Sequence, residues 1–430
     1  MLRLAIVGVV AAAAGLGQSD PAVAAKFDVV KRTATTINGI SVDLYSWYDS
    51  KKLLRTVALK REGKGNPGHG GYAVQMTYEV KGANNAVRTV VADGMAEGFG
   101  YFVSHERYRT FTDGQQGTIA RKIFNRDDSP LGRNFPVKEK RFISADRKWA
   151  AHQFRMTYDR YGTVEPIPKD PNTGQDVAPT PTDPTKLKKY TKPITILWVF
   201  EAGTDFPRID ITVDLSKIKR PDRVNFDVRG PYGVLVFDNG KNATVKRVMW
   251  GDSHHFNVTQ TPVTRNTPWN WNKKNTGARY TALIAGQYEM GLMEPVPYKS
   301  TALRDGYSDG RGRTSATYHS GKGCPDNGQT LPCDWEWPYQ SLQYSLPYNN
   351  LNQPTNYTKI AWGSAPYYGT GRSLKRLYDT PTTSRAFVGW PASRQIAYSV
   401  CVVLGVTIAG GLTKAAAAAG STLTCAAAQP

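Results

Sequence analysis

Apolar and polar residues alternate with a period of two along much of this chain, as they do in strands that bury one face. The alternating runs are rich in Val, Ile, Thr, Tyr and Phe, and they end at Gly, Asn, Asp or Pro. The best helical segment is short, at residues 146–153, and no repeat of fixed period occurs. Strands are predicted at residues 40–48, 72–80, 86–92, 100–108, 195–201, 208–215, 224–238, 243–250 and 279–289.

This strand content predicts an all-β fold, a large antiparallel β-sandwich or two-sheet supersandwich with long aromatic-rich loops. The length of 430 residues allows one large domain, and residues 26–430 are interpreted as one. Residues 165–193 contain seven prolines, which would remove hydrogen bonds from a central strand. That stretch is therefore predicted to be a surface loop or linker.

The first 25 residues have the pattern of a secretory signal peptide. Arg3 precedes an apolar run over residues 4–16, and small residues at Ala22 and Ala24 form a cleavage pattern. A buried helix or membrane anchor is the alternative, but the run is shorter than a bilayer requires. The sequence thus predicts a secreted or periplasmic protein with no stable membrane insertion after the signal is removed.

All four cysteines lie in the last quarter of the chain, at Cys324, Cys333, Cys401 and Cys425. An even number in an exported protein predicts disulfides, here Cys324 with Cys333 and Cys401 with Cys425, which would staple residues 295–430. A zinc site is less favoured, because no histidine lies at ligand spacing from these cysteines. The apolar residues 396–412 are predicted to form a strand, followed by a small-residue turn and a last strand ending at Cys425.

Lysine and arginine total 55 against 35 acidic residues, a formal charge of +20 that is spread along the chain. Such an excess bears on partners rather than on fold. Nucleic acid is not the predicted partner, because the chain carries an export signal and shows no nucleic-acid-binding motif. An acidic polysaccharide is the predicted partner, since it is both extracellular and polyanionic.

The densest cluster of polar and aromatic residues spans residues 227–274. Histidines at the end of a strand suit binding or catalysis, although adjacent ones point to opposite faces. The alternative is that these residues are turn formers and ordinary surface residues. Catalysis is assigned to Arg229, Tyr232, Asp252, His254 and His255, and substrate binding to Trp250, Trp269, Trp271 and Lys273.

Two further clusters are candidate substrate-binding sites. His105, Arg107 and Arg109 would share one face of a strand and suit a carboxylate or sulfate, or else form a solvated outer face. Trp335, Trp337 and Tyr339 would stack on sugar rings or pack in a core.

Several reaction classes lack their motifs: no nucleophile elbow, zinc-protease helix, P-loop or dinucleotide fingerprint is present. No metal site and no cofactor are predicted, and a structural Ca²⁺ is left open at the turn-rich residues 305–309.

The first functional hypothesis is therefore a polysaccharide lyase that acts by β-elimination on a glycan containing uronic acid. Arg229, or Arg107 with Arg109, would neutralise the carboxylate, His254 or His255 would remove the α-proton, and Tyr232 would protonate the leaving oxygen. A glycoside hydrolase with paired carboxylates is the alternative enzyme, and a non-catalytic glycan-binding envelope protein is the third hypothesis. The candidate hydrolase carboxylates are Glu201, Asp205, Asp252, Glu289 and Glu294.

Overall fold

Two antiparallel β-sheets make up most of the described part of the computed structural model. The two sheets face each other, which confirms the predicted all-β sandwich fold. The structure describes residues 27–65, 68–81, 84–94, 98–103, 132–163, 172, 187–214, 216, 229–237, 247–251, 256–258, 280–285, 288–293, 295, 333–337, 342–348, 358–363, 367–368, 387–388, 393–406 and 425–430.

The ten-stranded sheet begins with a meander of neighbouring strands and then takes in strands from later in the chain. Its order is β1-β2-β3-β4-β5-β11-β18-β17-β16, and β6 pairs with both β11 and β4. The strands are β1 (Lys31–Ile37), β2 (Ile40–Tyr48), β3 (Leu54–Lys60), β4 (Ala73–Lys81), β5 (Val87–Asp93), β6 (Phe99–Val103), β11 (Arg229–Phe237), β16 (Cys333–Trp337), β17 (Leu342–Tyr348) and β18 (Thr358–Gly363).

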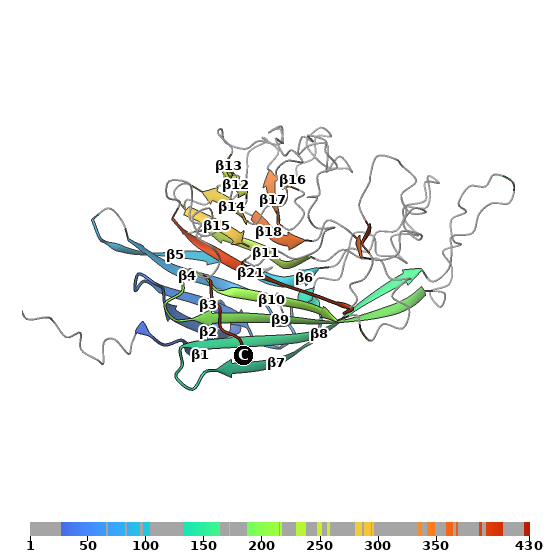
Figure 1. The fold of residues 1–430 in the computed structure, drawn as a ribbon, viewed down its shortest axis with the longest axis horizontal. Helices are drawn as coiled ribbons and strands as arrows, with labels where there is room; N and C mark the ends of the chain where they lie inside the picture. The colour runs from blue at the N-terminus through green and yellow to red at the C-terminus, as the bar shows by residue number, and fades with distance from the viewer. Residues whose placement is uncertain are drawn as a thin grey trace, which may run out of the picture.

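The nine-stranded sheet has the order β13-β12-β14-β15-β21-β10-β9-β8-β7, so that β21 lies between β15 and β10. Its longest pair, β8 with β9, extends beyond the sheets at the right of Figure 1. The strands are β7 (Val137–Ile143), β8 (Trp149–Thr163), β9 (Leu187–Glu201), β10 (Arg208–Asp214), β12 (Arg247–Gly251), β13 (Phe256–Val258), β14 (Tyr280–Ala285), β15 (Tyr288–Met293) and β21 (Gln395–Val406). A short parallel pair, β19 (Tyr367–Tyr368) with β20 (Phe387–Val388), and the 3₁₀ turn η1 (Gly132–Asn134) complete the elements.

Aromatic side chains fill the space between the two sheets. Tyr45 of β2 stacks on Phe200 of β9 at a centroid distance of 4.4 Å, and Trp47 lies 5.5 Å from the same ring. Trp198 is fully buried and packs against the backbone of Gly100, where a Cβ atom would come within 2.4 Å of its ring. Because large aromatic rings contribute the most buried area per residue, these contacts hold the sheets together.

The last six described residues, 425–430, lie on the outer face of the nine-stranded sheet. The Cys401–Cys425 disulfide fixes the start of this tail, and Arg208 Nη1 donates to the carbonyl oxygen of Ala426 at 2.6 Å. Ala426 packs against Leu197 and neighbouring apolar residues on that face. The tail therefore covers a sheet face that solvent would otherwise reach.

The predicted disulfide between Cys401 and Cys425 is confirmed, and Cys425 also forms an isolated parallel bridge with Phe206. Of the strand predicted at residues 396–412, residues 396–406 are present in β21, and the rest lie outside the described residues. Cys324, the N-terminal segment 1–25 and most of residues 165–193 lie outside the described residues. No helix in the described part of the chain is long and apolar enough to cross a membrane.

Three of the secondary-structure predictions are wrong in part. Residues 149–153 belong to β8 rather than to a helix, and residues 279–289 contain all of β14 and the start of β15 rather than one strand. Residues 187–193 were predicted to be loop, but they belong to β9. Pro193 has a neighbouring strand on one side only: it pairs with Thr157 of β8, but the pairing of β10 with β9 stops at Ile194. A proline, which lacks the N–H donor, is tolerated at such an edge position.

Candidate functional site

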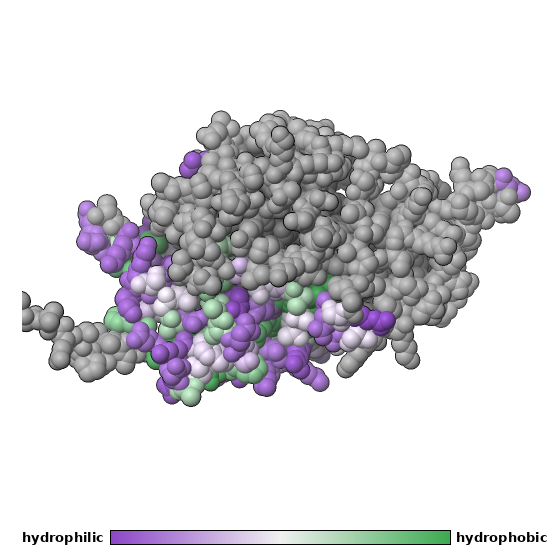
Figure 2. Space-filling view, viewed as in Figure 1, coloured by the Kyte–Doolittle hydropathy of each residue, from purple (hydrophilic) through white to green (hydrophobic). Residues whose placement is uncertain are grey.

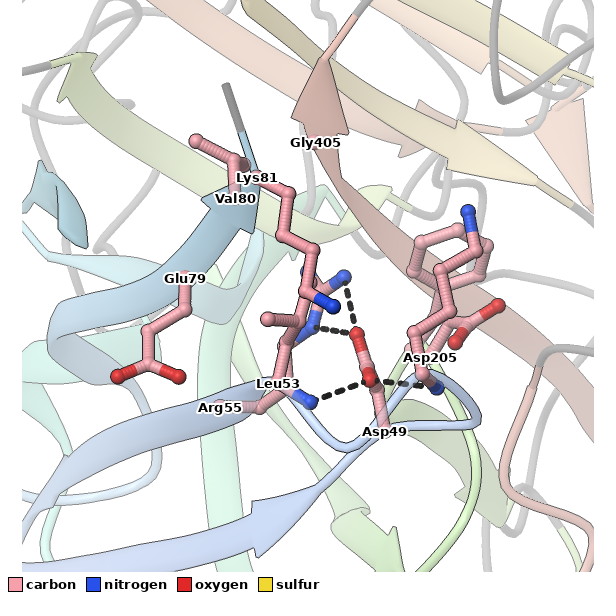
Figure 3. Close-up of a pocket in the computed structure, with 10 residues that line it drawn as sticks. Asp49, Leu53, Arg55, Glu79, Val80, Lys81, Asp205 and Gly405 are labelled. Atoms are coloured by element: carbon pink, nitrogen blue, oxygen red, sulfur yellow. Dashed lines mark hydrogen bonds and ion pairs between the residues drawn. The ribbon is translucent and has the colours of Figure 1, made fainter. Parts of the chain in front are cut away.

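A cleft of about 210 Å³ opens at one end of the sandwich, where four separate segments of the chain meet. The segments are the turn between β2 and β3, the end of β4, the residues before β10 and the end of β21 (Figure 3). Leu53, Val80 and Phe206 are apolar lining residues. The charged lining residues are Asp49, Lys51, Arg55, Glu79, Lys81 and Asp205.

Asp49 and Arg55 form the buried floor of this cleft. Oδ2 of Asp49 accepts from Nη2 and Nε of Arg55 at 3.0 and 3.2 Å, and Oδ1 accepts from the backbone N–H groups of Lys51 and Leu53, both at 2.8 Å. Arg55 Nη1 donates to the carbonyl oxygen of Leu404 at 2.7 Å, which links the floor to the other sheet. Both side chains are held by hydrogen bonds within the protein, so neither presents an unpaired charge to a ligand.

The other two acids of the cleft are each held through one oxygen. Asp205 Oδ1 accepts from Ser50 Oγ at 2.7 Å, and Glu79 Oε2 accepts from the Leu54 N–H at 2.8 Å. Figure 3 shows the Glu79 carboxylate directed away from the Asp49–Arg55 pair. The second oxygen of each carboxylate accepts no hydrogen bond from the residues that the structure describes.

Two lysines of the cleft, by contrast, have no acidic partner among the residues that the structure describes. Lys51 and Lys81 are exposed, and neither ammonium group forms an ion pair within the described residues. In Figure 3 the Lys81 side chain extends toward the Asp49–Arg55 pair. The cleft therefore offers two free cationic donors and two half-free carboxylate acceptors, a set that suits a ligand carrying both an anionic group and hydroxyls.

The cleft residues differ from the predicted site residues, with Asp205 the exception. Arg229 and Tyr232 lie in β11, and the Tyr232 ring packs 5.4 Å from the Tyr101 ring, half-buried. Trp250 lies in β12, and Trp335 and Trp337 lie in β16. The remaining predicted residues lie outside the described part of the chain: His105, Arg107, Arg109, Asp252, His254, His255, Trp269, Trp271, Lys273 and Tyr339.

Strand β12 ends at Gly251, which pairs with Phe256 at the start of β13. Strand registers place Gly251 level with Tyr280, Met293 and then Cys401, whereas the cleft is lined by Gly405. Gly251 and Gly405 are therefore separated by four residues along the strand direction, roughly 13 Å, and by three strand spacings across the sheet, roughly 14 Å. The hairpin end and the cleft are thus separate regions of the nine-stranded sheet.

Two of the candidate hydrolase carboxylates have other surroundings. Glu201 Oε2 accepts from the N–H groups of Ala427 and Ala428 at 2.7 and 3.1 Å, so Glu201 anchors the tail. Glu289 of β15 is fully buried. Among the described residues, no group of three His, Cys, Asp or Glu side chains is placed to hold a metal ion.

A second charged cluster lies between the two sheets, beside their edge strands β1 and β7. Asp43 of β2 is fully buried and accepts from Arg141 Nε at 2.6 Å and from Arg32 Nε at 3.1 Å. Burial alone would raise the pKa of Asp43, but the hydrogen bonds from Arg141 and Arg32 outweigh it and hold the pKa below its ordinary value. This cluster joins the sheets and is closed to solvent at Asp43.

His152 lies inside that cluster, fully buried between two carboxylates. Its Nδ1 is 3.8 Å from Asp43 Oδ2 and its Nε2 is 3.7 Å from Glu139 Oε1, and neither nitrogen has a hydrogen bond within the described residues. Burial, reinforced by the positive charge of Arg141, lowers the pKa of His152 to about 3. The ring is therefore neutral at ordinary pH and stacks on Phe154 at 4.0 Å.

No protein-family model matches this chain, and no curated protein matches it. One similar solved structure is a protein in glycosyl hydrolase family 38 from Enterococcus faecalis, with 7% sequence identity and a TM-score of 0.33. The alignment covers 84% of this chain and 30% of the other, so the chain spans less than a third of that neighbour's length. Function is therefore argued from the residues of this chain alone.

Proposed function

We propose that this protein is an exported carbohydrate-active protein that binds an acidic polysaccharide in the end cleft. The observation that carries the proposal is the imbalance of free groups there: Lys51 and Lys81 have no acidic partner among the described residues, whereas Asp49 is fully engaged within the fold. The charges of Asp49 and Arg55 in the cleft floor cancel each other. The two lysine ammonium groups can therefore attract a carboxylate without first breaking an ion pair within the described residues.

The same cleft supplies acceptors for sugar hydroxyls. Asp205 keeps one carboxylate oxygen free of protein hydrogen bonds within the described part, and Glu79 keeps another. A uronic acid unit carries one carboxylate among several hydroxyls, which matches two cations beside two acceptors. Lysine makes a point-charge contact, so binding through these groups weakens as salt rises.

Export is part of this proposal, with the protein secreted or periplasmic. It is supported by the N-terminal sequence pattern and by the Cys401–Cys425 disulfide, because disulfides persist in oxidising compartments.

The finer proposal is that the polymer is also cut by β-elimination, at residues outside the end cleft. His254 or His255 would act as the base, Tyr232 as the acid, and Arg229, or Arg107 with Arg109, would neutralise the substrate carboxylate. It rests on residue type and on the clustering of residues 227–274 in the sequence. Hydrolysis by Asp205 and Glu79 is the second candidate reaction, favoured by the free oxygen that each side chain presents in the cleft.

The test compares K51A/K81A with K64A/K148A, which removes two exposed lysines that are not lining residues of the cleft. Binding is measured on polyuronates and on neutral glucans at low and high salt. We expect the cleft variant to lose roughly tenfold or more in affinity for polyuronate, and the control to stay within twofold. Equal binding by the two variants contradicts the cleft assignment.

The reaction is read from the same polymers incubated with the protein. Elimination produces an unsaturated uronate that absorbs in the ultraviolet, whereas hydrolysis releases reducing ends without that absorbance. Binding with neither product leaves a non-catalytic glycan-binding protein and removes the lyase and hydrolase proposals. If elimination occurs, the variant H254A/H255A is expected to abolish it, and full activity in that variant rejects the histidine base.

A further inference from the structure

The outer face of the nine-stranded sheet has a part that the C-terminal tail does not cover, at β7 and β8. Side chains on this face alternate with those of the core: Val137 points inward and is buried, whereas Lys138 points outward and is exposed. Lys140 and Arg155 are exposed on the same side, because Lys138 pairs directly with Arg155 and Lys140 lies two residues further along β7. We call Lys138, Lys140 and Arg155 the basic face.

The three cations of the basic face have no acidic partner among the described residues. The neighbouring Glu139 points inward, where it accepts from the Glu62 N–H at 2.7 Å and pairs with Arg141. Register places the uncharged residues Gln153 and Thr195 beside the basic face, opposite Lys140 and Arg155. In Figure 2 the lower rim of the described surface, where Figure 1 places β7, shows hydrophilic residues among hydrophobic ones.

Two like charges directly opposite each other on neighbouring strands are destabilising. Sheets normally place an opposite charge or an uncharged residue at such a position. Here the position is occupied by Lys138 and Arg155, and Lys140 adds a third cation, with its Nζ 4.6 Å from the Phe142 ring centroid. A bound polyanion would relieve this repulsion, so the arrangement favours an anionic occupant.

We propose that the basic face docks the extended chain of an acidic polysaccharide, as a second binding surface separate from the end cleft. This inference rests on the proposed function and deepens it, because it makes the ligand a polymer long enough to reach both surfaces. The cleft is lined by no residue of β7 or β8. Arg155 can contact a carboxylate or sulfate with two N–H groups, and the hydroxyl and amide of Thr195 and Gln153 suit sugar hydroxyls.

Two separate surfaces on one protein bind a long polymer more tightly than a short one, because the second contact becomes intramolecular. The test uses the triple variant K138Q/K140Q/R155Q and the control K31Q/K64Q/K148Q, which loses the same charge from exposed lysines elsewhere. Affinities are measured for a long polyuronate, a short oligouronate and duplex DNA over a range of salt. Thermal melting confirms that both variants are folded.

We expect the triple variant to lose roughly tenfold in affinity for the long polyuronate and to show a shallower salt dependence, with the oligouronate affinity unchanged. The control should match the wild type. If the triple variant binds the long polymer like the wild type, the basic face is rejected while the cleft proposal stands. Tighter binding of DNA than of polyuronate through the same three residues would reject the glycan as occupant. A wild-type protein that binds no polyuronate overturns both proposals.

Discussion

Arg141 of β7 donates from Nε to Oδ2 of Asp43 in β2 at 2.6 Å, and this ion pair connects the two sheets of the sandwich. Asp43 is fully buried, and its other oxygen accepts from Arg32 of β1. An uncompensated buried charge is costly, so the pair is expected to matter more when one partner is removed than when both are replaced.

The substitution D43N is expected to destabilise the protein by about 3 kcal/mol, because it leaves Arg141 and Arg32 without their carboxylate. The matched control is D28N, which removes an exposed carboxylate 3.4 Å from Lys52 and should cost about 0.5 kcal/mol. Urea unfolding measures both. Equal midpoints for the two variants would contradict a structural role for the buried pair.

Because of His152, the stability of the protein should decrease as the pH is lowered. Its pKa is lowered from 6.5 to about 3 in the folded protein, so below pH 6.5 the unfolded chain binds a proton that the folded protein rejects. The stabilising contribution is complete above pH 6.5 and is lost as pH falls toward 3. Asp43, whose pKa is also lowered, adds a further loss below its ordinary value of 3.8.

The variant H152F removes the loss of stability at low pH that comes from His152. Phenylalanine fills a similar space beside Phe154, and the histidine nitrogens have no hydrogen bond within the described residues to lose. Chemical unfolding at pH 8 and pH 5 should show a smaller decrease in stability for H152F than for the wild type. An identical decrease in the two proteins would rule out His152 as the source.

The Cys401–Cys425 disulfide closes a loop with a sequence separation of 24 residues. Loop-closure entropy gives a stabilisation of about 3.5 kcal/mol, so C401A/C425A should unfold at a clearly lower denaturant concentration. Loss of the staple also frees the tail from the apolar residues Leu197 and Val199, which should increase binding of a hydrophobic dye. A variant with wild-type stability would show that Arg208 and Glu201 hold the tail without the disulfide.

Gly100 has a φ of +112°, and a Cβ atom there would come within 2.4 Å of the Trp198 ring. The substitution G100A is therefore expected to cost roughly 3 kcal/mol or more, from backbone strain and overpacking together. Gly203 has a φ of +82° with nothing within 4 Å of the added atom, so G203A isolates the backbone cost of about 1–2 kcal/mol. Thermal unfolding should rank G100A below G203A.

Strands with one solvated face were predictable from the sequence, because their alternation follows the pleat. Residues 40–48 and 208–215 match β2 and β10 almost to the residue. The start of β8 was not predictable, since Ala151 points outward yet is buried beneath the tail. Both faces are therefore covered at that point, and the period of two disappears. The covering residues lie at the far end of the sequence.

The end cleft was not predictable for a related reason. Its lining comes from residues 49–55, 79–81, 205–206 and 405, and no local motif connects them. Asp205 alone was proposed from its residue type. The cross-strand position of Lys138 and Arg155 likewise depends on the register of β7 with β8, which the printed sequence does not state. The assignments of His254 and His255 stay predictions.

The place of β21 in the nine-stranded sheet fixes the order in which this protein can be completed. β21 pairs with β10 on one side and β15 on the other, yet it emerges from the ribosome about 180 residues after β10. Until then, β10 has β9 on one side only and β15 has β14 on one side only, so the two halves of the nine-stranded sheet cannot join during synthesis. The two halves of the nine-stranded sheet are therefore joined only after residues 395–406 have been synthesised.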